Sequence, residues 1–472
     1  MIDETSSSPN RPPAPPEAWE PLLRLARLAA RPLDRFLHIE AASGILLMVS
    51  AAFALVMANS RWADAYAHFW HIPLGLHIGA YHFERSLEWV VNDGLMVIFF
   101  FVVGLEIKRE LHHGELSEWR RASLPALAAL GGMLVPAGLY LVIAGAPSTR
   151  SGWGVPMATD IAFAVGVLTL LGSRVPAALR VLLLALAVID DLGAILGIAL
   201  FYSEGLNFAG FGVAALGVGG VLAMRGAGVR TRMLYVVPGL VVWAGIYGAG
   251  VHPTIAGVIM GLLTPVRAWL GPDGFVQSVR QGLDEMTHTD VTSLSSHHLA
   301  ISLARVNEAR REALSPTEGL IEVLHPWVAF LIMPIFALAN AGVSLGQVSL
   351  GGDGGLVALG VAAGLVLGKP IGVMVACEAA IRLNISTLPA GLSRRHLLVL
   401  GMAAGIGFTM ALFVAQLAFS DVTLLGPAKL GILIASGVAG VLCVVGGRVL
   451  LPLTPQGQVA TTADEAESST IR

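Results

Sequence analysis

The sequence predicts an all-α polytopic membrane protein with about twelve transmembrane helices. Of its 472 residues, 55% are hydrophobic and only 13% are charged, whereas about 25% of the residues in an ordinary soluble domain carry a charge. The apolar residues gather in continuous runs of about 20 residues, the length with which a helix crosses about 30 Å of hydrocarbon. These runs lack the alternation of period two that the strands of a membrane β-barrel require.

Twelve such runs follow one another along the chain. They occupy 38–60, 94–112, 121–145, 155–173, 177–202, 206–225, 232–249, 251–266, 324–343, 356–381, 394–420 and 425–450. The 55 glycines suit a helical bundle, because small residues let helices approach closely. Lys and Arg concentrate in alternate connections, which the positive-inside rule assigns to the cytoplasm. Both termini are therefore expected in the cytoplasm.

The membrane domain is expected over 37–451, between a polar, Pro-rich tail at 1–36 and a second tail at 452–472. The first tail lacks the basic region and apolar core of a cleaved signal. Two connections are longer than a bundle needs. Residues 61–92, with aromatic and β-forming residues around central glycines, predict an extracytoplasmic hairpin that pairs two protomers. Residues 267–323 form a cytoplasmic loop in which we expect an amphipathic helix.

Two adjacent acids, Asp190 and Asp191, lie in the middle of the run 177–202. A carboxylate at the bilayer centre costs about 2.5–3.5 kcal/mol on insertion scales, unless a cavity, a cation or protons relieve the cost. The alternative is a structural pair that hydrogen-bonds neighbouring helices. Because successive helical residues point about 100° apart, we expect one carboxylate to face a water-filled funnel and the other to meet a neighbouring helix.

A third acid lies in the run 155–173, which is short and opens with Gly154 and Pro156, as expected for a helix broken near the midplane. There Asp160 follows Thr159. The break exposes backbone carbonyls and amides, and the threonine adds a neutral oxygen. Oxygen ligands suit a hard cation such as sodium. Alternatively, Thr-Asp is an ordinary helix N-cap.

A lysine also lies within an apolar run: "LGKPIG" places Lys369 before Pro370, which is expected to kink the helix. A buried ammonium requires an acid or gives up its proton, and Asp190 and Asp160 are the candidates. Glycines interrupt a second run, 394–420. Paired interruptions in the two halves indicate inverted repeats, although the glycines alone also suit close packing.

Seven motifs occur in the order in which a known family has them: "VVNDGLMVIFFFVVGLEIKREL", "PMATDIAFAVGVL", "LALAVIDDLGAI", "GVHPTIAGVIMGLLTP", "LHPWVAFLIMPIFALANAGVSL", "LGKPIG" and "GIGFTMALFVAQLAF". With them, roughly 37–451 resembles the NhaA family of bacterial sodium/proton antiporters. The resemblance implies twelve helices in the bacterial inner membrane, with inverted repeats and two crossing interrupted helices, 155–173 and 394–420. It further implies a homodimer and electrogenic exchange of internal Na+ or Li+ for external H+, activated at alkaline pH. No enzyme activity, cofactor or nucleic acid is expected.

The resemblance also assigns roles to the intramembrane polar residues. Asp191 and Asp190 are expected to bind Na+ or Li+ and protons, with Asp160, Thr159 and Lys369 around the crossing. If cation and proton compete for one carboxylate, and only occupied carriers switch their access, exchange follows without a covalent step. Electrogenic exchange requires a second titrating group, which is either Asp190 or Lys369.

The resemblance places a pH sensor near the cytoplasmic ends of the helices. Glu106 and Glu110 share one helical face in "GLEIKREL", although a charged helix end explains them equally well. His252 titrates in the right range but alternatively caps its helix, and Asp93 is interpreted as a helix cap. The fourth sensor candidate is His325.

One departure from the family falls in this region. Before "LHPW" the family typically has an acid followed by a histidine, whereas this chain has Ile321 and Glu322. The pH threshold of activation is therefore expected to differ, or activation to be weaker.

Two other classes fit less well. An intramembrane aspartyl protease carries its two acids on different helices with a "GxGD" type of loop, and that function leaves Lys369 unexplained. A cation channel needs repeated rings of acids or carbonyls along a pore, and the sequence contains no such repeated filter.

Overall fold

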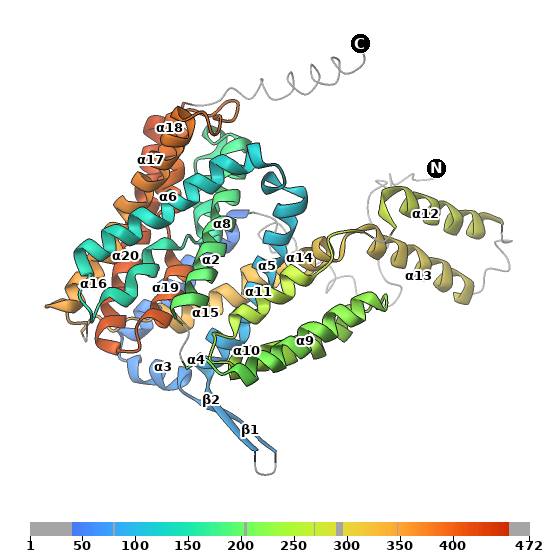
Figure 1. Cartoon of the computed structure of the whole chain (residues 1–472), viewed down its shortest axis with the longest axis horizontal. Helices are drawn as coiled ribbons and strands as arrows, with labels where there is room; N and C mark the ends of the chain where they lie inside the picture. Colours follow the sequence, from blue (N-terminus) through green and yellow to red (C-terminus); the bar gives the residue numbers. More distant parts are fainter. Residues whose placement is uncertain are drawn as a thin grey trace, which may run out of the picture.

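The computed structural model describes residues 40–452, except 79–80, 203–204, 269, 289–295 and 347. The predicted tails therefore lie outside the described residues, apart from Pro452. The described chain is a helical membrane protein (Figure 1). Seven of its helices are long and apolar enough to cross a membrane, and three bent helix pairs bring the candidate spans to ten. Two shorter apolar helices, Arg232–Gly248 and Thr254–Leu263, correspond to the remaining predicted runs.

The elements follow the predicted runs closely. The first third contains α2 (Glu40–Ala58), α3 (Ala63–Trp70), β1 (Pro73–Ile78), β2 (Tyr81–Ser86), α4 (Leu87–Trp89), η1 (Val90–Leu95), α5 (Met96–His113), η2 (Glu115–Ser117) and α6 (Trp119–Ala144). The middle contains η3 (Arg150–Met157), α7 (Ile161–Thr169), η4 (Gly172–Arg174), α8 (Ala177–Phe201), α9 (Phe208–Gly226), η5 (Arg232–Tyr235), α10 (Val236–Gly248), α11 (Thr254–Leu263), α12 (Gly271–His288) and α13 (Ser296–Ala313). The last third contains α14 (Pro316–Trp327), η6 (Val328–Ile332), α15 (Met333–Asn340), α16 (Asp353–Ala363), η7 (Gly364–Gly368), α17 (Lys369–Arg382), α18 (Arg394–Ala404), α19 (Phe408–Ala418) and α20 (Val422–Leu450).

One of the three bent pairs is α2 with α3, bent by 118°. The other two are interrupted spans in the two runs that the sequence singled out. The first consists of the 3₁₀ segment η3 followed by α7, with a bend of 41°, and the second consists of α18 followed by α19, with a bend of 49°. The first interrupted span starts at Arg150, before the predicted limit of 155. Between the half-helices, a few residues leave the helical conformation, so backbone groups at the breaks are free to bind partners outside their own helix.

The helix that carries Lys369 continues through Pro370, and Asp353–Arg382 forms one span of 30 residues. A π-helical turn, η7, directly precedes Lys369. Such a turn shifts the hydrogen-bond pattern locally and so accommodates the proline, whose ring cannot donate a backbone hydrogen bond. The lysine therefore lies on a continuous helix, and the kink expected at Pro370 stays a prediction.

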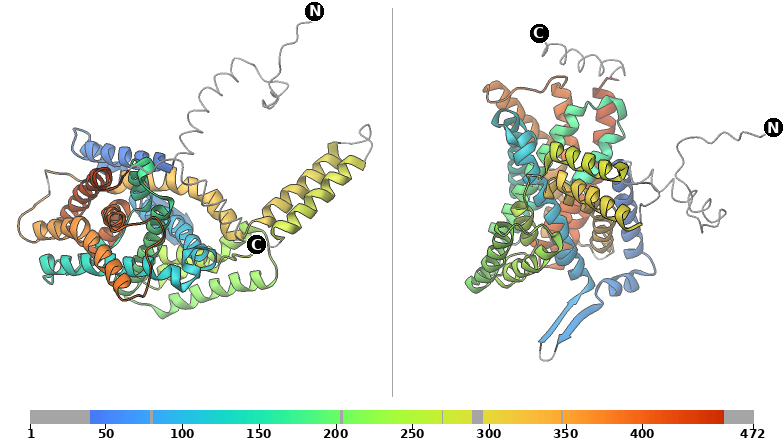
Figure 2. Two further views of the ribbon diagram at one scale, coloured as in Figure 1. Left: turned by 90° about the horizontal axis from the view of Figure 1, so that it is seen from above. Right: turned by 90° about the vertical axis from the view of Figure 1, so that its right-hand side faces the viewer.

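A two-stranded antiparallel sheet, β1–β2, extends from one end of the bundle (Figures 1 and 2). Its register pairs Pro73 with Ser86 and Ile78 with Tyr81. The strands fall within 61–92, where a hairpin was expected. The polar loop 267–323 contains the helix pair α12 and α13, which projects sideways from the bundle (Figure 2). The sequence predicted a helix where α13 lies but not α12, and α14 begins inside this loop, ahead of the predicted 324.

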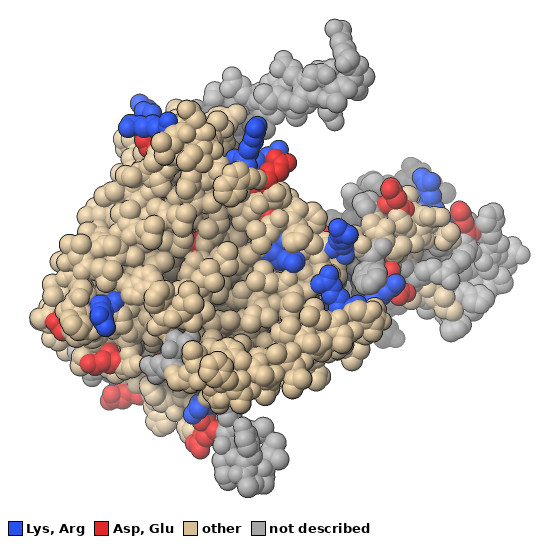
Figure 3. Space-filling model, viewed as in Figure 1, with Lys and Arg blue, Asp and Glu red and all other residues tan. Residues whose placement is uncertain are grey.

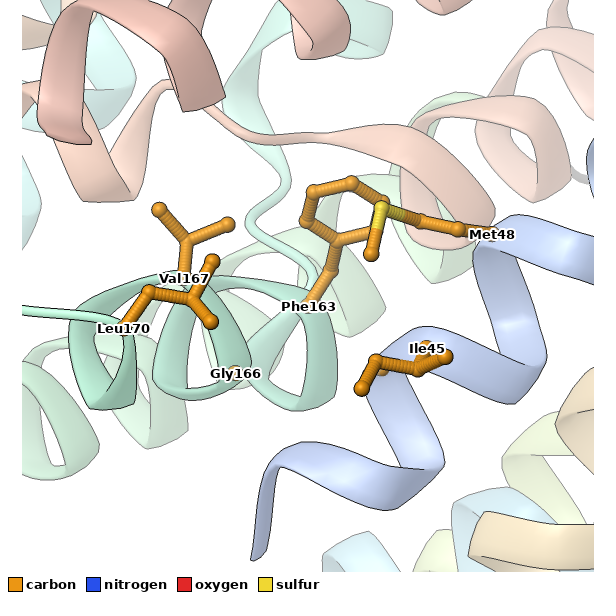
Figure 4. Close-up of a pocket in the computed structure, with 7 residues that line it drawn as sticks. Ile45, Met48, Phe163, Gly166, Val167 and Leu170 are labelled. Carbon is orange, nitrogen blue, oxygen red and sulfur yellow. The ribbon is translucent and has the colours of Figure 1, made fainter.

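Most spanning helices share one apolar core, and much of the outer surface is apolar too. Figure 3 shows a broad uncharged area over the bundle, and side chains such as Leu134, Val142 and Leu200 are 68%, 83% and 74% exposed. Large apolar side chains on the outside of a helical bundle suit contact with lipid. On one side, Gly44 of α2 contacts the backbone of α7 at Gly166, beside a small apolar hollow lined by Ile45, Met48 and Phe163 (Figure 4).

Candidate ion-binding site

The two interrupted helices meet at their breaks. The backbone N–H of Asp160 donates to the carbonyl oxygen of Ile406, 2.8 Å away. The hydroxyl oxygen of Thr159 lies 3.0 Å from the carbonyl oxygen of Ala404. Both carbonyls belong to the end of α18 and the turn that follows it. The backbone groups that the breaks leave unpaired are thus satisfied across the crossing, as a buried break in a membrane requires.

The carboxylate of Asp160 caps two half-helices at once. Its Oδ1 accepts from the backbone N–H of Phe163 at 3.0 Å, which makes Asp160 the N-cap of α7. Its Oδ2 accepts from the backbone N–H of Thr409 at 3.2 Å, and also from the Thr409 hydroxyl, both at the start of α19. A negative charge near two helix N-termini is electrostatically favourable. The N-cap interpretation of Thr-Asp is thus confirmed.

Lys369 finds its counter-charge in Asp190. The ammonium Nζ lies 2.6 Å from Asp190 Oδ2 and also donates to the hydroxyl of Thr159. The same hydroxyl oxygen lies 2.7 Å from Asp190 Oδ2. All three side chains have 0% exposure. A buried ion pair of this kind is stable only when hydrogen bonds satisfy its polar groups, and Thr159 contributes to this.

Asp191 differs from its neighbour. Its side chain is 1% exposed, yet among the side chains that the structure describes neither Oδ1 nor Oδ2 has a hydrogen-bond partner, and Asp190 Oδ1 has none either. The expectation that the two carboxylates face different surroundings is met, but Asp191 lies shut away from solvent rather than in an open funnel. An unpartnered buried carboxylate is costly, and a bound proton or cation removes that cost. Carboxylate oxygens are the kind of ligand that a hard monovalent cation prefers.

Three of the four predicted pH-sensing residues lie around Arg109. Glu106 lies within electrostatic range of Arg109, of Glu110 and of Asp191. Glu110 lies 3.7 Å from Arg109 and accepts from the backbone N–H of Glu115 at 3.2 Å, which ties the end of α5 to the turn that follows. His325, on α14, also lies within electrostatic range of Arg109.

The remaining sensor candidate, His252, lies elsewhere, at a contact between helices. His252 Nε2 lies 3.3 Å from Asp93 Oδ1, and its Nδ1 lies 2.8 Å from the hydroxyl of Thr254. Asp93 belongs to the π-helical turn η1, so its interpretation as a helix cap is wrong. The imidazole packs edge-on against Phe413.

Thr409 belongs to the crossing but was not predicted from the sequence. A threonine in the first turn after the break "GIG" was the available signal, because hydroxyl groups satisfy polar groups at helix N-termini. Its partner was not predictable, since Asp160 lies 249 positions away in the chain.

Comparison with known proteins identifies the family of the chain that forms this crossing. A family model described as Na+/H+ antiporter 1 matches residues 34–446. The chain belongs to this Na+/H+ antiporter family. The predicted resemblance to the NhaA antiporters is therefore confirmed.

Relatives of this family member match over nearly their full length. The Na+/H+ antiporter NhaA 2 of Myxococcus xanthus is 65% identical, covering 99% of both chains. That of Sorangium cellulosum is 56% identical, covering 97% of this chain and 98% of the relative. A solved structure of the sodium proton antiporter MjNhaP1 from Methanocaldococcus jannaschii has 14% identity and a TM-score of 0.49, covering 91% of this chain and 97% of that one.

Proposed function

We propose that this chain exchanges Na+ or Li+ for H+ across the bacterial inner membrane, as an electrogenic and pH-regulated antiporter that works as a homodimer. The observation that carries the proposal is the pair of unpartnered oxygens of Asp191, buried beside the crossing of two interrupted helices. The names of the relatives support the choice of ions.

In the proposed mechanism, Asp191 is the group for which the ions compete. A proton neutralises its carboxylate, and a sodium ion restores the charged form and is held by Asp191 with Oδ1 of Asp190. Because one group serves both ions, binding of one excludes the other. If access switches only when the site is occupied, the two fluxes are coupled.

The electrogenic part requires a second proton. We assign it to the pair of Lys369 and Asp190, which are 2.6 Å apart and titrate as one unit. A cation that occupies Asp190 Oδ1 repels the adjacent ammonium, so Na+ binding favours loss of a proton from the pair as well as from Asp191. Thr159 keeps both partners in place in either state.

The first test uses everted membrane vesicles with an acid interior. Added Na+ or Li+ should collapse the pH gradient in the wild type, more strongly at alkaline pH, and not in Asp191→Asn. The matched control is Asp64→Asn, which removes an exposed acid on α3 and should behave as the wild type. If the wild type, shown to be folded, responds to neither cation at any pH, cation/proton exchange is excluded.

A second measurement reports on binding without transport. Because a ligand that binds only the native state stabilises it, Na+ should raise the unfolding temperature of the purified wild type but not of Asp191→Asn. An equal rise in both proteins would place the cation elsewhere.

A further inference from the structure

A chain of polar side chains lies at the hairpin end of the bundle, away from the ion site. Gln416, near the end of α19, donates from Nε2 to Glu88 Oε1 at 3.4 Å and to Asn340 Oδ1. Asn340, the last residue of α15, donates to Asn92 Oδ1 in η1 at 2.8 Å. Segments far apart in the sequence thus converge on one hydrogen-bonded chain.

Exposure decreases from His71 to Asn340. His71 Nε2 lies 3.9 Å from Glu88 Oε2, and the two side chains are 69% and 28% exposed. Gln416 is half-buried, Asn340 has 0% exposure, and Asn92 beyond it is half-buried. Polar groups that continue inward from solvent to full burial are costly in an apolar bundle. We call the series of side chains from His71 to Asn340 the polar path.

An aromatic layer separates the polar chain from the ion site. Phe413 contacts Phe100 and Phe336, with ring centroids 5.2 and 6.2 Å apart, and all three are at most 1% exposed. On α19, Phe413 lies about one turn from Gln416 on one side and about one turn from Thr409 on the other. Thr409 binds Asp160 at the crossing. The path therefore ends one layer of side chains short of the buried carboxylates.

The outer end of the path carries opposing charges. Glu88 is faced by Tyr66 and His71 from α3 and its following turn, and by Lys429 from α20, which lies within electrostatic range. Lys429 is half-buried. The carboxylate of Glu88 attracts a hard cation, and a neighbouring ammonium repels it.

We propose that Glu88 and Gln416 form an outer transfer site for Na+, where the ion pauses between solvent on the hairpin side and the carboxylates at the crossing. The inference rests on the proposed Na+/H+ exchange and assigns its outer route. The purely structural alternative is a polar clamp between helices, since amide hydrogen bonds commonly join membrane helices.

The variant Glu88→Gln separates these two roles. Its amide oxygen still accepts from Gln416, so the clamp is kept while the negative charge is lost. The KM for Na+ is measured at the hairpin face by Na+ uptake into right-side-out vesicles, and at the cytoplasmic face by dissipation of the pH gradient in everted vesicles. We expect the KM at the hairpin face to rise about threefold to tenfold and the KM at the cytoplasmic face to be unchanged.

The variant Lys429→Met removes the positive charge near Glu88, whereas Glu88→Gln removes the negative charge. Loss of the ammonium should lower the KM for Na+ at the hairpin face, whereas damage to a clamp would not improve affinity. The matched control is Glu84→Gln, which loses the same charge at an exposed position on β2 and should leave both KM values unchanged.

The outcomes distinguish this inference from the function on which it rests. If the wild type exchanges ions while Glu88→Gln leaves the KM at the hairpin face unchanged, the transfer site is refuted and the exchange stands. A change at both faces, or in the same direction for Glu88→Gln and Lys429→Met, also refutes it in favour of the clamp. Absence of exchange in the wild type refutes the proposed function itself.

Discussion

At the residue scale, two neighbouring aspartates have opposite surroundings. Asp190 is bound to Lys369 through Oδ2, whereas both oxygens of Asp191 are buried without a partner in the described chain. Oδ2 of Asp190 already has its counter-charge, whereas Oδ1 of Asp190 and both oxygens of Asp191 are left for an ion in the proposed mechanism. The contrast separates their roles more clearly than their sequence positions do.

This contrast predicts opposite effects on stability. Asp190→Asn leaves the Lys369 ammonium buried without a counter-charge, and breaking a buried pair costs about 3–5 kcal/mol, so the unfolding temperature in detergent should fall. Asp191→Asn removes a carboxylate that no donor satisfies, so the unfolding temperature should stay or rise. Thermal unfolding of the two purified variants without Na+ checks this. A similar fall in both would contradict the assignment.

Thr409 should contribute through its hydroxyl rather than its size. Thr409→Val keeps the shape of the side chain but removes a donor to buried Asp160, which is expected to cost about 1–3 kcal/mol of unfolding free energy. Thr409→Ser keeps the hydroxyl donor and should therefore retain most of the wild-type unfolding free energy. Equal losses in the two variants, measured by thermal unfolding, would show that packing matters instead.

The sequence predicted the residues of the site but not their pairing. Because a charge inside the membrane is energetically costly, the charged residues within apolar runs were identified from the sequence alone as candidates for the site. They are Asp160, Asp190, Asp191 and Lys369. The sequence left two acids as candidates for the lysine, because the choice depends on how α8 and α17 pack. The unpartnered state of Asp191 is likewise a property of the packed bundle.

At the element scale, close contact between helices positions the site. A Cβ on Gly131 of α6 would overlap the carbonyl oxygen of Gly372 on α17, and a Cβ on Gly372 would overlap that of Gly131. The backbones of α6 and α17 are therefore in contact one turn away from Lys369. This contact fixes the position of α17, and so of Lys369 relative to Asp190 on α8.

Gly131→Ala tests this contact. The added methyl group meets backbone rather than a flexible side chain, and overpacking of this kind costs about 1–3 kcal/mol, so the unfolding temperature should fall. Gly138→Ala on the same helix meets nothing within 4 Å and should be neutral or stabilising, by up to about 1 kcal/mol. If both variants unfold alike, the contact does not limit stability.

Sequence patterns predicted the broken helices better than the intact ones. Gly and Pro at 154–156 and the glycines at 405 and 407 identified both breaks. At Pro370 the helix continues through a π-helical turn, η7, and no local pattern in the sequence predicted that turn.

At the scale of the whole molecule, hydrophobic runs predicted the number and order of the spans. Charge predicts their direction, with the hairpin outside the cell. The lateral pair α12 and α13 was only half predicted, although the two helices have the same length of 18 residues. An apolar run predicts that a helix is present, but it does not predict which other helices pack against that helix.

Thiol labelling tests the predicted orientation of the chain in the membrane. A membrane-impermeant reagent applied to intact cells should label Glu84→Cys on β2 and should label Arg395→Cys, at the start of α18, only after permeabilisation. Both positions are exposed, and the native Cys377 and Cys443, at 0% exposure, should give little background. Labelling of Arg395→Cys alone in intact cells would reverse the orientation.

The bonds across the two helix breaks limit which parts of the protein can move. Four hydrogen bonds join Thr159 and Asp160 to the segment from Ala404 to Thr409. Separating the two breaks would rupture all four inside the membrane, where no water replaces them. We therefore expect the two interrupted helices to move together, and any sliding to occur at their borders, such as the contact of Gly44 with Gly166, where no side chain intervenes. A break would destabilise a single helix, but here the backbone groups at the two breaks hydrogen-bond across the crossing and hold the two helices together.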